Sequence, residues 1–540
     1  MTGEARSLRT ARIALLAMCV AVVAVAWTRH APLPQTNSSA PGSFDATRAL
    51  KHLESLAVDG APRDPGSSGH ARAATLLREE IARLGLDALS QRFVSRGWKR
   101  SAVEMGNLLV VVPNAAGSTE GELVLLNAHY DGVPMGPGAG DNAVGVACAL
   151  EIARVLQQSP CDRAVLVLFS DGEELGLLGA REFVKENPLW KRVVGVVNLD
   201  ARGSNGPVYV FETGARDSWH AELLSRAPIT SRTTSLAAEA YARMPNGTDF
   251  SVFRAVGTRG FNLAFIGSPE NYHTADDTVS NVDPNTLAQM GTDALTLVRA
   301  LAAAPDPRAT TAQGAIWFDA FGWFVCWWPD WVSHALVACS VLLLSFAFWR
   351  LRALGLASLG GVVLATIAAC AALGAAIGAG IGGTLAVRAL HPDHWPWPTY
   401  LWGCDLALLA IGFTLTSVPL AWLSRRRRAR RTAILVAWDD AIAAWTLLAA
   451  IAVTIAILAP GASHPVLLPL MAASLAGALV AGLRRSRATP AWAAFACAML
   501  FMISWAPLEW AFVDAFGLSF GAFTTLRGAL LALACRGIVR

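Results

Sequence analysis

Residues 127–147 read NAHYDGVPMGPGAGDNAVGVA, and we expect this stretch to decide the fold. The apolar run before it is typical of a strand, and the apolar run that begins at Ala143 is typical of a helix. His129 and Asp131 therefore stand where a strand ends, and Asp141 stands where a helix begins. Imidazole and carboxylate groups are ligands for a borderline divalent ion such as zinc. In open α/β sheets, ligands bind at the carboxyl ends of the strands, so this loop is a candidate metal site. Further ligands from the rest of the chain would be needed to complete it.

The composition indicates a membrane protein. The chain has 540 residues, of which 54% are hydrophobic and 16% charged, and the charged residues are concentrated in the first three hundred. A net charge of +4 is small for this length, so general nucleic-acid binding is not indicated. The nine cysteines are scattered without pairs at metal-binding spacing. A framework of structural disulfides is therefore not expected.

Residues 1–30 read as an N-terminal signal anchor or transmembrane helix. Arg6, Arg9 and Arg12 precede the uncharged apolar run 13–27. This run is short for a spanning helix, and its flanks also fit a cleaved secretory signal. Both interpretations place the following residues across the membrane, because the positive end stays in the cytoplasm. Residues 31–43, rich in Pro, Ser and Asn, are expected to form a linker.

Residues 44–303 show strand patterns that alternate with helical ones. This order predicts an α/β domain with a mainly parallel, mixed sheet that is flanked by helices. The expected strands lie near 91–95, 107–112, 122–128, 164–169, 193–199 and 207–211. The expected helices lie near 44–57, 69–85, 142–157, 175–186, 216–226 and 285–302.

Residues 304–330 are expected to form an aromatic linker at the membrane interface, since their aromatic side chains suit an interface better than a soluble core. These aromatic residues are Trp317, Phe318, Phe321, Trp323, Phe324, Trp327 and Trp328. Residues 331–540 contain about seven apolar runs, which predict a C-terminal α-helical transmembrane domain. Arg527 lies within the last run and must pair, reach the interface or face the bundle interior.

The ends of the apolar runs differ in charge, which predicts the topology. One set of ends carries Arg350, Arg352, 425–428, Arg430, Arg431, Arg484, Arg485, Arg487, Arg536 and Arg540. The opposite set carries His391, Pro392, Trp395, Trp397, 460–465 and Glu509. By the positive-inside rule the arginine ends are cytoplasmic, so residues 31–330 lie on the far side. The N-terminal signal predicts the same orientation.

Four more polar positions follow apolar runs. Glu173 and Glu174 come after the strand near 164–169, Asp200 after the strand near 193–199, and His273 after the apolar run 261–266. Adjacent carboxylates can serve as one metal ligand and one base. They can also simply open an exposed helix, where acidic groups complement the helix dipole. Asp200 alone could form a turn or cap, and His273 alone could be solvated.

Taken in order, these motifs resemble a known family. His-x-Asp, Gly-x-Gly-Asp-Asn, Glu-Glu-x-Gly-Leu-x-Gly, Asn-Leu-Asp and Tyr-His-Thr are similar to the motifs of the di-zinc aminopeptidases, a family that also contains glutamate carboxypeptidase and glutaminyl cyclase. Residues 198–214 and 244–277 resemble its membrane branch, the vacuolar membrane proteases and endoplasmic reticulum metallopeptidases. The resemblance covers about residues 45–303 in detail and the membrane half only in architecture.

The resemblance implies two zinc ions per chain, held by His129, Asp141, Glu174, Asp200 and His273. It implies that Asp141 bridges the ions, with His129 and Asp200 completing one site and Glu174 and His273 the other. Glu173 would be the general base, and Asp131 would orient His129, as metal-bound histidines usually require. Asp200 stands where the eukaryotic membrane relatives often have Glu, and Asp still provides a carboxylate ligand. Asp249 and Arg202 lie in family-like motifs, but Asp249 could be a helix cap and Arg202 a surface pair.

The implied function is a membrane-anchored metallopeptidase, most simply an aminopeptidase, that acts on peptide substrates outside the cytoplasm. A glutaminyl-peptide cyclotransferase with one catalytic zinc is an alternative on the same fold, and a receptor or scaffold that has lost its activity is another. The arginine-over-lysine, alanine-rich composition favours a bacterial inner membrane with a periplasmic domain. A lumenal domain on an organelle membrane is the alternative.

Overall fold

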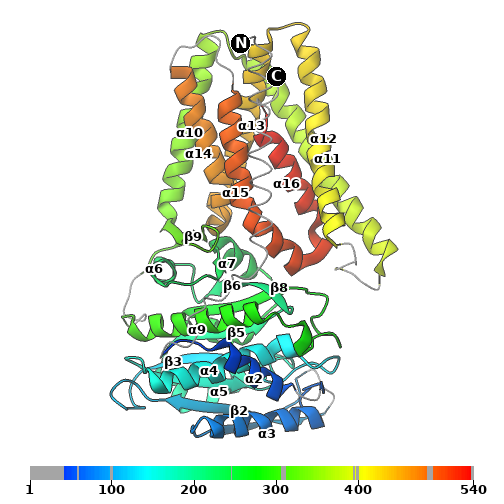
Figure 1. The fold of residues 1–540 in the computed structure, drawn as a ribbon. Coiled ribbons are helices and arrows are strands. Elements are labelled where there is room, and N and C mark those ends of the chain that lie inside the picture. The colour runs from blue at the N-terminus through cyan, green and yellow to red at the C-terminus, as the bar shows by residue number, and fades with distance from the viewer. Residues whose placement is uncertain are drawn as a thin grey trace. The chain divides into compact units, whose positions relative to one another are not determined.

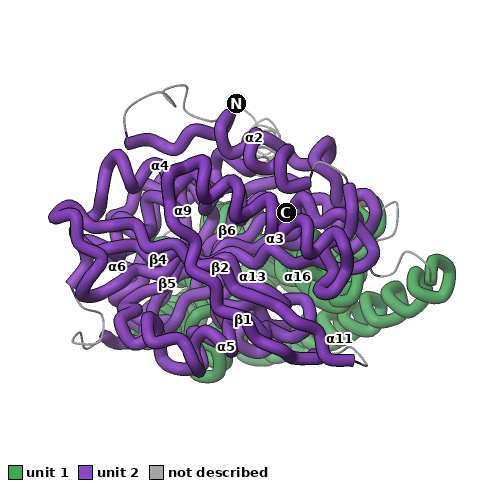
Figure 2. The backbone as a smooth tube through the Cα atoms, turned by 90° about the horizontal axis from the view of Figure 1, so that it is seen from below, with its two compact units in different colours: residues 1–29, 330–540 green, residues 30–329 purple. Residues whose placement is uncertain are grey.

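The computed structural model describes residues 42–57, 60–97, 101–244, 246–305, 312–392, 396, 401–482 and 490–536. Two compact units divide the chain: one comprises residues 30–329, and the other comprises residues 1–29 and 330–540 (Figure 2). The expected anchor at 1–30 and nearly all of the expected linker at 31–43 lie outside the described residues. So do Arg484, Arg485, Arg487, Arg540, Trp395 and Trp397.

A mixed eight-stranded sheet forms the centre of the first unit, in the order β1-β2-β4-β3-β5-β8-β6-β7 (Figure 1). The strands are β1 (Leu89–Ser95), β2 (Val103–Val112), β3 (Leu123–His129), β4 (Ala164–Ser170), β5 (Val193–Ala201), β6 (Asn205–Thr213), β7 (Arg232–Thr233) and β8 (Gly260–Gly267). The central strands β4, β3, β5 and β8 run parallel to one another, whereas β1, β2 and β6 pair antiparallel. The predicted mainly parallel α/β sheet is confirmed.

Helices cover both faces of this sheet, which explains why its central strands are mainly apolar. The helices of the unit are α2 (Ala46–Leu56), α3 (Ser68–Arg83), α4 (Val144–Gln158), α5 (Leu178–Glu186), α6 (Ser218–Arg226), α7 (Ser235–Tyr241), α8 (Asp249–Ala255) and α9 (Pro284–Ala303). In β3, Val124 and Leu126 belong to the core that contains residues of α4 and α9. Leu123 and Leu125 belong to the core that contains residues of α5 and α8. Alternate side chains thus enter opposite cores.

Four of the helices, α2, α4, α5 and α6, begin later than the sequence pattern predicted, and the delays of α4 and α5 shape the loops at the sheet edge. The helix expected from 142 begins at Val144, because Asp141 and Asn142 have non-helical backbone angles. The helix expected from 175 begins at Leu178, because residues 172–177 form a turn in which Leu177 has a φ of 61°. Each late start leaves a non-helical loop between the end of a strand and the helix that follows it: β3 before α4, and β4 before α5.

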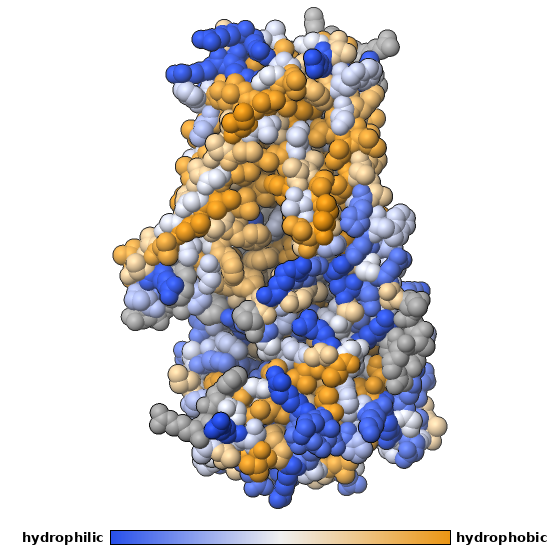
Figure 3. Space-filling model, turned by 180° about the vertical axis from the view of Figure 1, so that it is seen from behind, coloured by the Kyte–Doolittle hydropathy of each residue, from blue (hydrophilic) through white to orange (hydrophobic). Residues whose placement is uncertain are grey.

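The second unit contains α10 (Asp330–Ala353), α11 (Leu359–Leu390), α12 (Leu401–Arg428), α13 (Ala433–Leu458), α14 (His464–Gly482), α15 (Ala491–Phe516) and α16 (Gly521–Ala534). Six stretches of the described residues are long and apolar enough to cross a membrane, and Ala491–Trp505, within α15, is a shorter apolar stretch. Figure 3 shows apolar side chains gathered on the surface of this unit. This agrees with the expected C-terminal membrane domain.

Arg527 pairs inside the helical unit, as the sequence required. It is 3% exposed, and its Nη2 lies 3.5 Å from Oδ1 of Asp405 on α12. Thr524 donates a hydrogen bond of 2.8 Å to the same oxygen and accepts one of 2.9 Å from Arg527. A second group ties α12 to α13, where Arg427 contacts Asp439 and Asp440. The buried charges of these two groups are therefore paired.

The aromatic segment before α10 is an antiparallel hairpin, β9 (Ala315–Asp319) and β10 (Val325–Pro329), in place of the expected linker. The expectation of an interface was wrong for Trp317, which is 1% exposed and part of the core. Its indole Nε1 donates to Thr233 Oγ1 at 3.0 Å, so the polar atom of the ring is satisfied within the core. Trp323 and Phe324 at the turn are 81% and 59% exposed.

Candidate active site

Three neighbouring parallel strands deliver the candidate residues to one edge of the sheet. β3 ends at His129, β5 ends one residue after Asp200, and β4 ends at Ser170, just before the loop that carries Glu173 and Glu174. His129 pairs with Ser170 across the β3–β4 ladder, so these strand ends are level. The carboxyl ends of parallel strands are where α/β folds build their sites.

The five predicted ligands form two groups that share Asp141. In the first, Nε2 of His129 lies 3.2 Å from Asp141 Oδ1 and 3.7 Å from Asp200 Oδ1. In the second, Nε2 of His273 lies 3.1 Å from Asp141 Oδ2 and 3.0 Å from Glu174 Oε1. The candidate ligand atoms of each group all lie within 4.8 Å of one another. One oxygen of Asp141 faces each group, and such nitrogen and oxygen donors fit a pair of zinc ions.

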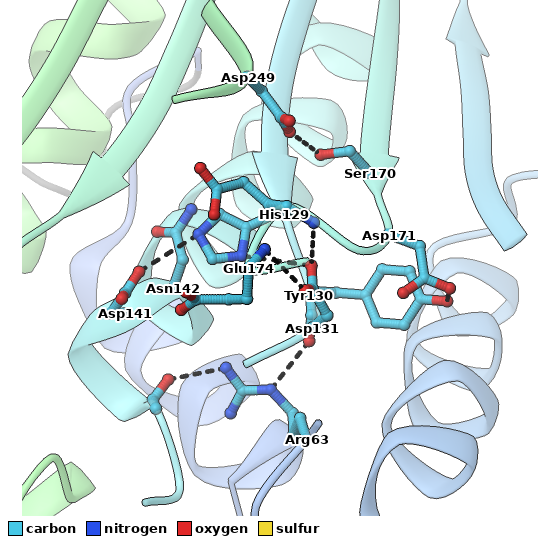
Figure 4. Close-up of polar contacts among 12 residues, drawn as sticks. Arg63, His129, Tyr130, Asp131, Asp141, Asn142, Ser170, Asp171, Glu174 and Asp249 are labelled. Carbon is cyan, nitrogen blue, oxygen red and sulfur yellow. Dashed lines mark hydrogen bonds and ion pairs between the residues drawn. The ribbon is translucent and has the colours of Figure 1, made fainter. Parts of the chain in front are cut away.

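Asp131 lies on the other side of His129 from Asp141 (Figure 4). Its Oδ1 lies 3.5 Å from Nδ1 of His129, the ring nitrogen on the side away from Asp141. The same carboxylate accepts hydrogen bonds from the backbone N–H groups of Glu173 at 3.1 Å and Glu174 at 3.2 Å. Asp131 therefore faces the imidazole of His129 and fixes the loop of the two glutamates.

Arg63 and Asp277, which the sequence reasoning did not single out, hold the loop of Asp141. Arg63 is 4% exposed and donates hydrogen bonds to the carbonyl oxygens of Tyr130, Pro137 and Gly138. Asp277 accepts from the backbone N–H groups of Gly140 at 2.6 Å and Asp141 at 3.1 Å. Because Asp277 follows His273 by four residues, it joins the loops of both ligand groups.

The comparisons with known proteins bear on this same region. Residues 107–298 match the model of peptidase family M28. This part of the chain belongs to peptidase family M28. The chain thus carries an M28 metallopeptidase domain together with helices of membrane-spanning length.

Relatives of the M28 domain include an endoplasmic reticulum metallopeptidase and a vacuolar membrane protease. Endoplasmic reticulum metallopeptidase 1 of Mus musculus is 28% identical over 324 residues, which are 55% of this chain and 36% of that protein. Vacuolar membrane protease of Eremothecium gossypii is 32% identical over 300 residues, 51% of this chain and 28% of that protein. The chain thus matches about a third of the length of these relatives.

Two solved structures also resemble the domain. A leucine aminopeptidase precursor from Bacteroides thetaiotaomicron has a TM-score of 0.40 at 19% identity, over 48% of this chain and 97% of that one. Glutaminyl cyclase of Porphyromonas gingivalis has a TM-score of 0.39 at 22% identity, over 48% of this chain and 98% of that one.

The charged groups of the M28 centre shift one another's pKa values. Burial opposes the imidazolium of His129, but the carboxylates that face it hold its pKa well above the usual value. Burial opposes the charged form of His273 too, yet its carboxylate neighbours raise its pKa to about 10. Burial raises the pKa of Glu173 well above its usual value; the attraction of His129 opposes this, and Asp200 and Glu174 add to it. Such a cluster of buried negative charge favours bound cations.

A row of buried asparagines lies across the M28 sheet, one in each of three neighbouring strands. Asn127 donates to Asn198 at 2.7 Å, and Asn198 donates to Asn262 at 2.8 Å. Asn262 in turn donates to Glu212 at 2.9 Å. Each asparagine interrupts an otherwise apolar strand, and that interruption is the sequence signal that could have revealed the row.

Asp249 belongs to the same buried layer and is not a helix cap. Thr248 is the N-terminal cap of α8, whereas Asp249 accepts hydrogen bonds from Ser170 and from Asn127. Burial raises its pKa to about 6, although His129 and the two donors oppose this. Its carboxylate thus lies near the strand ends that carry the candidate ligands (Figure 4).

Proposed function

We propose that the chain is a membrane-anchored di-zinc metallopeptidase that hydrolyses peptide bonds outside the cytoplasm, as an aminopeptidase. The observation that carries this proposal is the pair of ligand groups that share Asp141, with Glu173 in the neighbouring loop. The family of the domain supports peptides as substrates.

His129, Asp141 and Asp200 would hold one zinc ion, and Asp141, Glu174 and His273 the other. Bound zinc supplies a water nucleophile near neutral pH and polarises the carbonyl of the scissile bond. The raised pKa of Glu173 suits a group that accepts a proton from the attacking water and returns it to the leaving amine. Asp131 keeps the loop of this base in place through the backbone N–H of Glu173.

The substitution Glu173→Gln tests the proposal. It keeps the shape of the side chain but removes the proton acceptor, so we expect a loss of about 10²–10⁴-fold in kcat for a peptide with a free N-terminus. Metal analysis and circular dichroism should show the zinc content and fold of the unchanged enzyme. Normal turnover in this variant would contradict the proposed role of Glu173.

The metal content separates this proposal from the other interpretations. Two tightly held zinc ions support the peptidase, whereas a single ion together with turnover of a peptide with N-terminal Gln would favour the cyclotransferase. An inactive scaffold is disfavoured because all five candidate ligands and Glu173 are in place.

We further propose that the peptidase domain lies on the side of the membrane opposite the arginine-rich helix ends. Arg350 and Arg352 end α10, and Arg425, Arg426 and Arg428 end α12. By the positive-inside rule these ends are cytoplasmic. The names of the relatives favour an organelle membrane with a lumenal domain over the bacterial inner membrane that the composition suggests.

A further inference from the structure

Arg202 follows β5 two positions after Asp200 and leaves the strand on the same face. Its backbone N–H donates to the carbonyl of Phe265 on β8 at 2.9 Å, so the pairing of the two strands continues through this residue. Residues two apart in a strand point to the same side. The contact of its guanidinium with the Tyr272 ring places the side chain of Arg202 beside the loop that carries His273.

The guanidinium lies beside the second group of ligands. Its Cζ is 5.7 Å from the ring centroid of Tyr272. The Tyr272 ring stacks on His273, with centroids 3.7 Å apart and planes 18° apart. Guanidinium, phenol ring and imidazole thus form a row that ends at the candidate metal centre. The aromatic face holds the cation in place.

Arg202 differs from the other arginine near the centre. Arg63 is buried, and its Nε, Nη1 and Nη2 donate hydrogen bonds to three backbone carbonyls, so it stabilises the loop of Asp141. Arg202 is partly exposed, and its guanidinium lies beside the row of Tyr272 and His273. The carboxylates of the centre would repel an anionic substrate group that lacked a fixed cation beside it.

We propose that Arg202 binds a carboxylate of the substrate, so that the enzyme prefers peptides with a carboxylate next to the scissile bond. This inference rests on the proposed peptidase function and specifies its substrate class. A guanidinium matches a carboxylate through two parallel hydrogen bonds. The C-terminal carboxylate of a dipeptide and an acidic side chain after the scissile bond share this chemistry.

Two matched pairs of peptides test the preference with the full-length, zinc-loaded protein. Leu-Ala and Leu-Ala-amide differ only in a terminal carboxylate. Leu-Glu-Ala-amide and Leu-Gln-Ala-amide differ only in an acidic side chain. We expect kcat/KM to be at least about tenfold higher for the charged member of one pair, because a charge-assisted contact of this kind is worth that factor. The pair that shows the preference identifies the source of the carboxylate.

Variants then assign the preference to Arg202. Arg202→Gln should reduce the ratio of charged to neutral kcat/KM toward one, and Arg202→Lys should restore part of it. The matched control is Arg226→Gln. Arg226 is an exposed arginine on α6 that pairs with Glu222, and its substitution should leave the ratio unchanged.

Three results would overturn the inference. Equal kcat/KM within both pairs in the unchanged enzyme excludes the preference while leaving the peptidase proposal intact. A ratio that survives in Arg202→Gln while both members slow equally shows a purely structural role for Arg202. The absence of turnover for all four peptides contradicts the peptidase proposal itself, and this inference with it.

Discussion

Asp141 is the residue on which both ligand groups depend. Its Oδ1 faces His129 and its Oδ2 faces His273, while Asp277 fixes its backbone N–H. Asp200, in contrast, belongs to the first group alone. Losing the charge of Asp141 should therefore disturb both ions, whereas losing the charge of Asp200 should disturb one.

We expect Asp141→Asn to reduce the bound zinc to below about one ion per chain, and Asp200→Asn to leave about one. The amide keeps the size of each side chain but removes the negative charge that favours cation binding. Mass spectrometry of metal content after dialysis measures both variants. Two ions retained by Asp141→Asn would show that this carboxylate is not shared.

At the scale of elements, the strand ends were predictable and the contacts between loops were not. Apolar runs followed by His129, Asp200 or the paired glutamates revealed β3, β5 and β4 with their polar ends, because strand burial follows directly from side-chain type. Arg63 and Asp277 were missed because they bind backbone groups of a distant loop, and no periodic pattern reports such contacts.

In the hairpin β9–β10, too, the sequence pattern did not predict which side chains are buried. Composition alone grouped Trp317 with Trp323, yet the first is 1% and the second 81% exposed. Their positions in the hairpin explain the difference in exposure. Trp317 lies within β9 and points into the core. Trp323 lies in the turn and follows Gly322, whose φ is 76°. Asp319 accepts from the Gly322 N–H at 2.8 Å and fixes the turn. We propose that this exposed aromatic turn contacts the lipid interface.

A photoreactive phenylalanine analogue in place of Trp323 tests this contact in the protein embedded in lipid nanodiscs. We expect lipid adducts at position 323 by mass spectrometry, because exposed Trp and Phe side chains favour the membrane interface. Trp331 at the start of α10 serves as the positive control and the exposed Val94 on β1 as the negative control. Adducts at 331 without any at 323 would show that the turn faces water.

For the whole molecule, the arginine-rich helix ends predict which side of the membrane holds the M28 domain. A reporter enzyme that is active only outside the cytoplasm should be active when fused after residue 250 and inactive when fused after Arg428. The reverse pattern would overturn the proposed topology while leaving the chemistry of the site untouched.

The whole protein also provides the most direct test of the two-ion peptidase. Chelation should remove the metal and abolish hydrolysis of a peptide with a free N-terminus, since the ions supply the nucleophile. Stepwise return of zinc should restore the activity to a plateau at two ions per chain. A plateau at one ion, or no hydrolysis at any zinc concentration, would contradict the proposal.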